Sequence, residues 1–292
     1  MAASTMVLSD LVNVVRFMID KASQAATNSE VKKMQETAEK GSEHKIHPHL
    51  DEKSSNEALS ELGKLKSQAT KLLSFIGITV SLTKMNQIVE SFSEVNDKIK
   101  YASDGLEDQQ AIQDKILQSA NECRTSYEEF GTYVADLSSQ SKDLFPIDDA
   151  REFAKLLSQN ETVAGKASNL SNVQTMLKSV FSTSKVSSTV FAQLKKTAPE
   201  VVDVLSEGLG KTEKQLESMA AGGTLTAKSV KEAYTKAADS ISKKYEDTAA
   251  SVSDALTIIS NRFGKKITDM NEKFKITETV AKVMLKGHNT GR

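Results

Sequence analysis

Residues 199–234 read PEVVDVLSEGLGKTEKQLESMAAGGTLTAKSVKEAY, with helix-starting and helix-ending residues at short intervals. A proline or a threonine stands where each helix is expected to begin, and glycine stands where the first two are expected to end. The residues of this structural motif are Pro199, Gly210, Gly223 and Thr226, and Thr212 is expected to cap the middle helix. The stretch therefore predicts a cluster of short, capped helices.

Apolar residues recur every three or four positions along most of the remaining chain, which is the period of an amphipathic helix. The run across residues 59–99 predicts long helices. Ser126 and Glu129 have the spacing of a capping box. Pro146 ends another helix, and Asp148 is expected to cap the one that follows.

The last element, from Ala227 to about Leu285, is predicted to be one long helix because an apolar stripe runs through it without a clear break. Two alternatives stay open at this point: a coiled coil, or an amphipathic helix packed on its own domain. The part of the stripe that we expect to contact a partner consists of Leu256, Ile259 and Phe263.

The composition also favours an all-α fold, since three prolines, thirteen glycines, no tryptophan and 5% aromatic residues are few for a sheet protein. We expect an elongated multi-helix bundle with long amphipathic helices and a cluster of short capped helices. Any strand is confined to residues 45–50. The expected parts are an N-terminal helix and linker (1–55), a helical region (56–185), the short-helix motif (186–236) and a long C-terminal helix (237–292).

No group of residues has the spacing that catalysis or metal binding needs. The histidines at 44, 47 and 49 lie close to Asp51, but no distant histidine or cysteine completes a metal set. Cys123 has no histidine near it in the sequence, so an inert, partly buried thiol is expected. We therefore predict that the protein is not an enzyme and uses no metal and no cofactor.

The charge balance argues against general nucleic-acid binding, because 38 Lys and Arg residues are offset by 39 Asp and Glu residues. Gly208–Thr212 resembles the end of a phosphate-binding loop, but the first glycine is missing, and a helix end followed by a helix start explains it. Residues 90–136 hold eleven acidic and four basic groups, and residues 262–292 hold eight basic and three acidic groups. Each segment is expected to be a solvated face or to meet a complementary partner.

The segment Val186–Tyr234, VSSTVFAQLKKTAPEVVDVLSEGLGKTEKQLESMAAGGTLTAKSVKEAY, resembles the N-terminal domain of phage tail tape measure proteins. The resemblance extends upstream through FSEVNDKIKYASDGLEDQQAIQDKILQSANECRTSYEEF and DLFPIDDAREFAKLL, and covers residues 74–263. Its anchors are a small-residue turn before a Leu-containing helix, an Ala-Pro helix start, two helices closed by glycine and a turn into a long helix. In this sequence they are Val186-Ser187, Leu194, Ala198-Pro199, Leu205 to Gly210, Leu216, Gly223, Leu225, Thr226 and Ala227.

The resemblance implies a structural protein around which tail tube subunits polymerise and whose length sets the tail length. The implied partners are tail tube subunits, tail assembly chaperones and other copies of the chain, with no specific nucleic-acid contact. The implied location is the lumen of the virion tail, after synthesis in the bacterial host cytoplasm. Because tape measure proteins usually continue for many hundreds of residues, the chain is expected to be a fragment or a truncated prophage product.

One alternative from a different functional class is a membrane-acting, cytolysin-like helical bundle. The apolar stretch Leu72–Leu82 lies between amphipathic segments and could insert as a hairpin, so membrane contact is left open.

Overall fold

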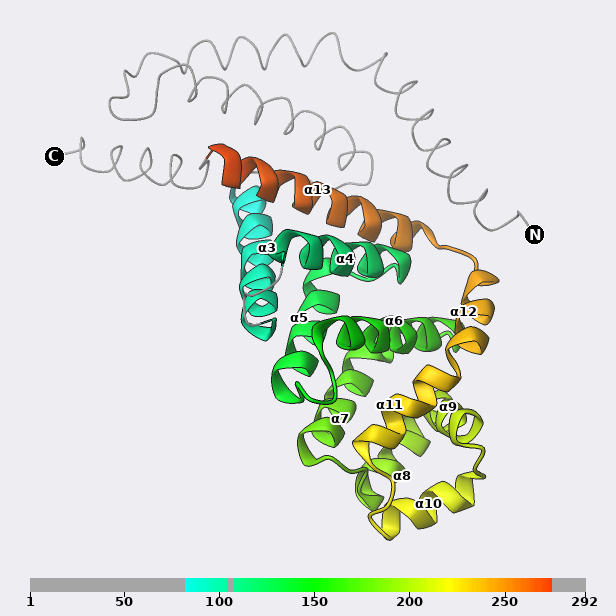
Figure 1. The fold of residues 1–292 in the computed structure, drawn as a ribbon. Helices are drawn as coiled ribbons and strands as arrows, with labels where there is room; N and C mark the ends of the chain where they lie inside the picture. The colour runs from blue at the N-terminus through cyan, green and yellow to red at the C-terminus, as the bar shows by residue number, and fades with distance from the viewer. Residues whose placement is uncertain (1–81, 104–107, 275–292) are drawn as a thin grey trace, which may run out of the picture. The chain divides into compact units, whose positions relative to one another are not determined.

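A computed structural model describes residues 82–103 and 108–274 of the 292-residue chain. Within these ranges the all-α prediction is confirmed: eleven α-helices and one short 3-10 helix follow one another, without a strand (Figure 1). The α-helices are α3 (Leu82–Ala102), α4 (Gln109–Glu122), α5 (Tyr127–Gln140), α6 (Ile147–Val163), α7 (Leu170–Thr183), α8 (Ser188–Thr197), α9 (Pro199–Leu209), α10 (Glu213–Ala221), α11 (Ala227–Lys236), α12 (Ala238–Glu246) and α13 (Val252–Phe274).

The chain divides into two compact units. One, called the helical domain below, consists of Phe92–Asn261, and the described residues 82–91 and 262–274 belong to the other. The predicted N-terminal helix and linker (1–55) and the possible strand at residues 45–50 lie outside the described residues. The four-part division made from the sequence therefore stays a prediction.

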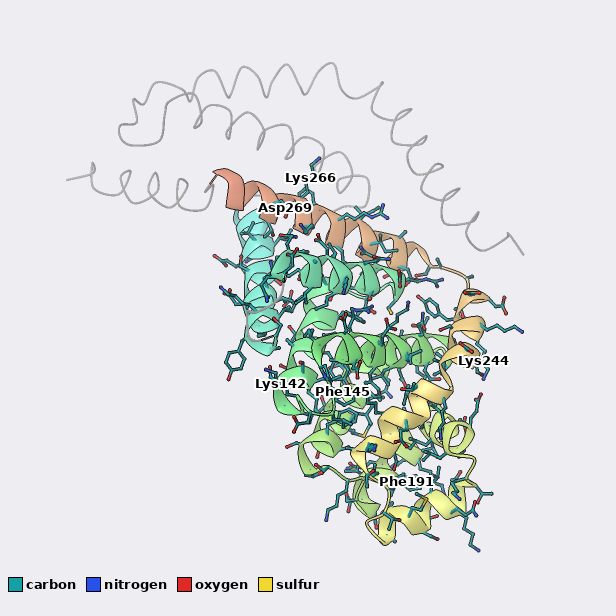
Figure 2. The ribbon with its side chains drawn as sticks, viewed as in Figure 1. Lys142, Phe145, Phe191, Lys244, Lys266 and Asp269 are labelled. Carbon is teal, nitrogen blue, oxygen red and sulfur yellow. The ribbon has the colours of Figure 1, made fainter. Side chains whose placement is uncertain are left out.

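Helix α6 is the centre of the helical domain, since α4, α5, α7, α9, α11 and α12 all pack against it (Figure 1). An aromatic cluster lies on this helix. Phe153 is 5.2 Å from Phe145, 5.3 Å from Phe181 and 5.0 Å from Tyr234 between ring centroids. Tilted and edge-to-face rings of this kind contribute about 0.5–1.5 kcal/mol per pair beyond their buried area. Phe145, just before α6, is labelled in Figure 2.

Backbone hydrogen bonds join two turns of the short-helix motif, one before α8 and one before α11. The N–H of Val186 donates to the carbonyl of Leu225 at 2.8 Å, and the N–H of Ala227 donates to the carbonyl of Ser184 at 3.0 Å. An isolated antiparallel bridge at the same place pairs Lys185 with Thr226. The turn before α8 is thus bonded to the turn before α11, so the ends of the motif lie together although they are distant in sequence.

The prediction of one continuous helix from Ala227 to about Leu285 is wrong within the described residues. The chain forms α11, α12 and α13 instead, with breaks at Ala237 and between Glu246 and Val252. Arg124 donates to the carbonyls of Thr248 at 2.9 Å and Ala249 at 3.1 Å, so residues beyond the end of α12 bond to the α4–α5 loop instead of continuing the helix. A tertiary contact thus replaces helical hydrogen bonds that the sequence pattern alone would favour.

Two predicted helix starts have different outcomes. Ser126 caps α5, because its hydroxyl oxygen accepts from the N–H of Glu129 at 3.2 Å. Asp148 does not cap α6: Pro146 is the N-cap residue, and Asp148 lies in the first helical turn. The proline brings the chain into the helix two residues earlier than expected, and Asp148 instead pairs with Arg151.

Candidate functional site

The predicted motif residues form the boundaries of three short helices. Pro199 is the first residue of α9, and Gly210 ends that helix in the left-handed region with φ 60° and ψ 39°. Gly223 has φ 69°, and the hydroxyl oxygen of Thr226 accepts from the N–H of Ser229 at 3.1 Å. These residues fix the turns of the motif by backbone geometry and offer no reactive group.

Thr212 caps α10, as predicted from the sequence, and Gln215 completes a capping box that was not predicted. Its hydroxyl oxygen accepts from the N–H of Gln215 at 3.3 Å, and its own N–H donates to the side-chain oxygen of Gln215 at 2.9 Å. The Thr-x-x-Gln spacing was the available signal. The start of α10 is therefore set by local hydrogen bonds.

Gly208 allows close packing between two helices, which was not predicted from the sequence. A Cβ at this residue would lie 2.3 Å from the carbonyl oxygen of Ala233 and 2.5 Å from its Cα. Helices α9 and α11 therefore approach so closely that only glycine fits. The one available signal was a glycine inside a helical pattern, which often marks a close packing contact.

The predicted interaction stripe is split between two environments. Its first part is buried inside the helical domain and is not an exposed surface, since it consists of Val230, Ala233, Ala237, Ile241 and Tyr245. In α13, Ile259 and Phe263 are half-buried, whereas Ile258 is buried. The side chain of Leu256 lies outside the described residues. A partner contact on α13 stays a prediction.

Asn261, near the middle of α13, bonds this helix to the α4–α5 loop and to the end of α4. Its side-chain oxygen accepts from the N–H of Tyr127 at 2.8 Å, and its amide nitrogen donates to Asn121 and to the carbonyl of Thr125, both at 2.9 Å. The side chain is 3% exposed, so these bonds satisfy buried groups. The contact holds the part of α13 that belongs to the helical domain against the α4–α5 loop.

A buried polar run forms the C-terminal part of α6. Its members are Ser158, Gln159, Asn160 and Glu161. Glu161 has no exposed surface, and it faces Glu200 of α9, whose Oε2 accepts from Lys166 Nζ at 2.8 Å. Burial and the neighbouring Glu200 raise the pKa of Glu161 to about 8. This pair was not predictable from the sequence, because a polar run near a helix end is usually solvated.

Cys123 is buried, and its Sγ lies 3.6 Å from the carbonyl oxygen of Lys155. Burial raises the pKa of the thiol to about 12, so almost no thiolate forms near neutral pH. The three histidines considered for a metal site, with Asp51, lie outside the described residues.

The charged segments contain internal ion pairs where they are described. In the acidic segment, Asp136 pairs with Lys178 at 2.7 Å and Glu122 pairs with Lys155 at 2.7 Å. In the basic segment, Lys265 pairs with Asp269 at 2.6 Å on α13, where Asp269 is labelled in Figure 2. Some charges of each segment therefore form ion pairs within the chain itself. Contact of either segment with a complementary partner stays a prediction.

Among residues 82–103 and 108–274, none of the helices combines the length and the apolar character needed to cross a membrane. The stretch Leu72–Leu82, on which the membrane-acting alternative rests, lies outside the described residues except for its last residue. That alternative is therefore neither supported nor contradicted.

Comparison with known proteins gives one match. A family model described as "Tape measure protein" matches residues 83–272, which is well over half of the chain and includes the whole helical domain. No curated protein and no solved structure matches the chain. The matched range overlaps the resemblance found from the sequence, residues 74–263, along almost all of its length.

Proposed function

We propose that this chain templates tail tube polymerisation and sets tail length. The proposal starts from the family: the chain belongs to the tape measure protein family and so has a structural role in the phage tail. The lumen of the tail tube is the proposed location. The observation that carries this proposal is the family match across residues 83–272. The proposed partners are tail tube subunits, tail assembly chaperones and other copies of the chain.

The proposed contact surface is the apolar face of α13. This helix has 23 residues and is about 35 Å long at 1.5 Å per residue. Ile259 and Phe263 are half-buried side chains on it, whereas Val230 and Tyr245 of the preceding helices already pack inside the helical domain. A half-buried apolar side chain is stabilised further when a partner helix covers it, because part of its surface is still exposed to water. A side chain that is already fully buried has no such surface left to cover.

Tube assembly tests the templating role. Tail tube subunits of the same phage are expressed with and without the chain, and tube lengths are measured by negative-stain electron microscopy. We expect a narrow length distribution only when the chain is present. A length distribution that is identical in both samples would contradict the proposal.

Self-association tests the contact surface on α13. We expect the chain to form oligomers at micromolar concentration, and Leu256→Asp with Ile259→Asp to dissociate them, because each charge would be buried without a partner. Ser260→Asp is the matched control, since Ser260 is exposed on the same helix. Sedimentation that shows a monomer for the unmodified chain would exclude self-association through α13.

A further inference from the structure

The Glu161 carboxyl group is in an environment that disfavours its charge. The side chain has no exposed surface, and neither of its oxygens accepts a hydrogen bond from another described residue. A buried carboxylate without donors is strongly destabilised relative to water, and it normally takes up a proton instead. The adjacent residue Asn160 shows that this end of α6 is in contact with α9, because its Nδ2 donates to the carbonyl of Glu200 at 3.4 Å.

The charged and titratable groups that face Glu161 come from three places. Glu200 lies at the N-terminus of α9, Lys166 follows α6, and Tyr234 belongs to α11. Tyr133 of α5 is a neighbour of Tyr234, and both phenol groups are buried. Burial raises the pKa of each tyrosine, so both stay neutral through the physiological range.

One proton shared between Glu161 and Glu200 removes the repulsion between the two carboxyl groups. Lys166 compensates the charge of Glu200 through its 2.8 Å ion pair, whereas no cation among the described residues forms an ion pair with Glu161. Two ionised carboxylates repel each other and neither has a hydrogen to donate, whereas a protonated Glu161 has one hydrogen available for Glu200. Burial and the neighbouring Glu200 together raise the pKa of Glu161 to about 8.

We propose that the Glu161–Glu200 pair is a pH-sensitive latch. While the two carboxyl groups share a proton, the pair holds the N-terminus of α9 against the end of α6. When the proton is lost at higher pH, the N-terminus of α9 separates from α6. Loss of the proton leaves two buried negative charges beside the single cation of Lys166. Separation of α9 from α6 lets water reach both carboxylates and removes the repulsion. The Asn160–Glu200 hydrogen bond is lost in the same movement.

The direction of the pH effect follows from proton binding. Below the ordinary glutamate pKa of 4.5, Glu161 is protonated in both the folded and the unfolded chain. Between 4.5 and about 8 only the folded chain holds the proton, so stability falls as the pH rises, by up to about tenfold in the folding equilibrium per pH unit. Above about 8 the folded chain has also lost the proton, and no further loss follows.

Thermal unfolding of the full chain from pH 5 to pH 9 tests this linkage. Glu161→Gln keeps the shape of the side chain and donates to Glu200 at every pH. We expect its melting temperature to exceed that of the unmodified chain by a margin that grows up to about pH 8 and then stays constant. Glu217→Gln is the matched control on an exposed glutamate and should follow the unmodified chain. A constant margin across the whole range would overturn the proposal.

A second measurement needs no variant and so does not depend on whether Glu161→Gln folds. In the unmodified chain, carboxyl carbon NMR should show one glutamate that titrates near pH 8. Amide hydrogen exchange, corrected for its intrinsic pH dependence, should become faster at residues 199–202 between pH 7 and pH 9, but not at residues 112–116 of α4. Absence of the titration, or titration without faster exchange in α9, rejects the latch.

Discussion

Replacement of Gly208 by alanine should separate α9 from α11. The added Cβ would lie 2.3 Å, 2.5 Å and 2.7 Å from the carbonyl oxygen, Cα and carbonyl carbon of Ala233, although ordinary contacts begin near 3.4 Å. All three are backbone atoms of a buried residue of α11, so no side-chain rotation can relieve the contact. The two helices must therefore move apart by about 1 Å, which weakens the packing of the apolar residues between them.

The size of this effect follows from two opposing contributions. Overpacking a core costs about 1–3 kcal/mol, and rigid backbone neighbours place this case near 3 kcal/mol. Alanine is better than glycine inside a helix by about 1 kcal/mol, so the net loss of stability is about 2 kcal/mol. For a domain of this size that corresponds to a decrease in melting temperature of about 4–8 °C. Circular dichroism at 222 nm measures this change.

Gly131→Ala is the matched control, because its added Cβ would meet one methyl group of Val95 at 2.5 Å, and a side chain can adjust. We expect a change within about 1 kcal/mol there. Ala233→Gly should not rescue Gly208→Ala, since the clashing atoms of residue 233 remain. A Gly208→Ala variant as stable as the unmodified chain would refute the close approach of α9 and α11.

Three further outcomes are expected. Gly210→Val should destabilise the short-helix motif by about 1 kcal/mol or more, measured by thermal unfolding, because a β-branched residue is strained at φ 60°. Asn261→Ala should lower the free energy of unfolding in urea by about 1–3 kcal/mol, since the buried N–H of Tyr127 loses its acceptor; an unchanged value would show that the contact is not needed. Cys123 should resist iodoacetamide in the native protein at pH 8 and react fully in denaturant, because burial raises its pKa to about 12; rapid labelling of the folded chain would contradict this.

The candidate contact surface was only partly predictable from the sequence. The apolar period indicated which residues of α11 to α13 share a face, but not whether their own domain or a partner covers that face. Val230 and Tyr245 are covered by the helical domain, whereas Ile259 and Phe263 stay half-buried. The apolar period shows that one face of a helix is apolar, but it does not show which segment covers that face.

Local chemistry was sufficient to predict the all-α class and the short-helix boundaries at Pro199, Gly210 and Thr226. These depend on interactions within a few residues, such as caps, a left-handed glycine and the apolar period, which are all present in the sequence itself. The resemblance to the tape measure family was also visible there, because it rests on the order of the same caps and turns.

Only the tertiary structure decided where distant groups meet. The break between α12 and α13 depends on Arg124, and the close approach of Gly208 depends on Ala233. The burial of Glu161 depends on Glu200, 39 positions further along the chain. In each case the free energy comes from a contact between segments far apart in sequence, so the local pattern of either segment carries no record of it.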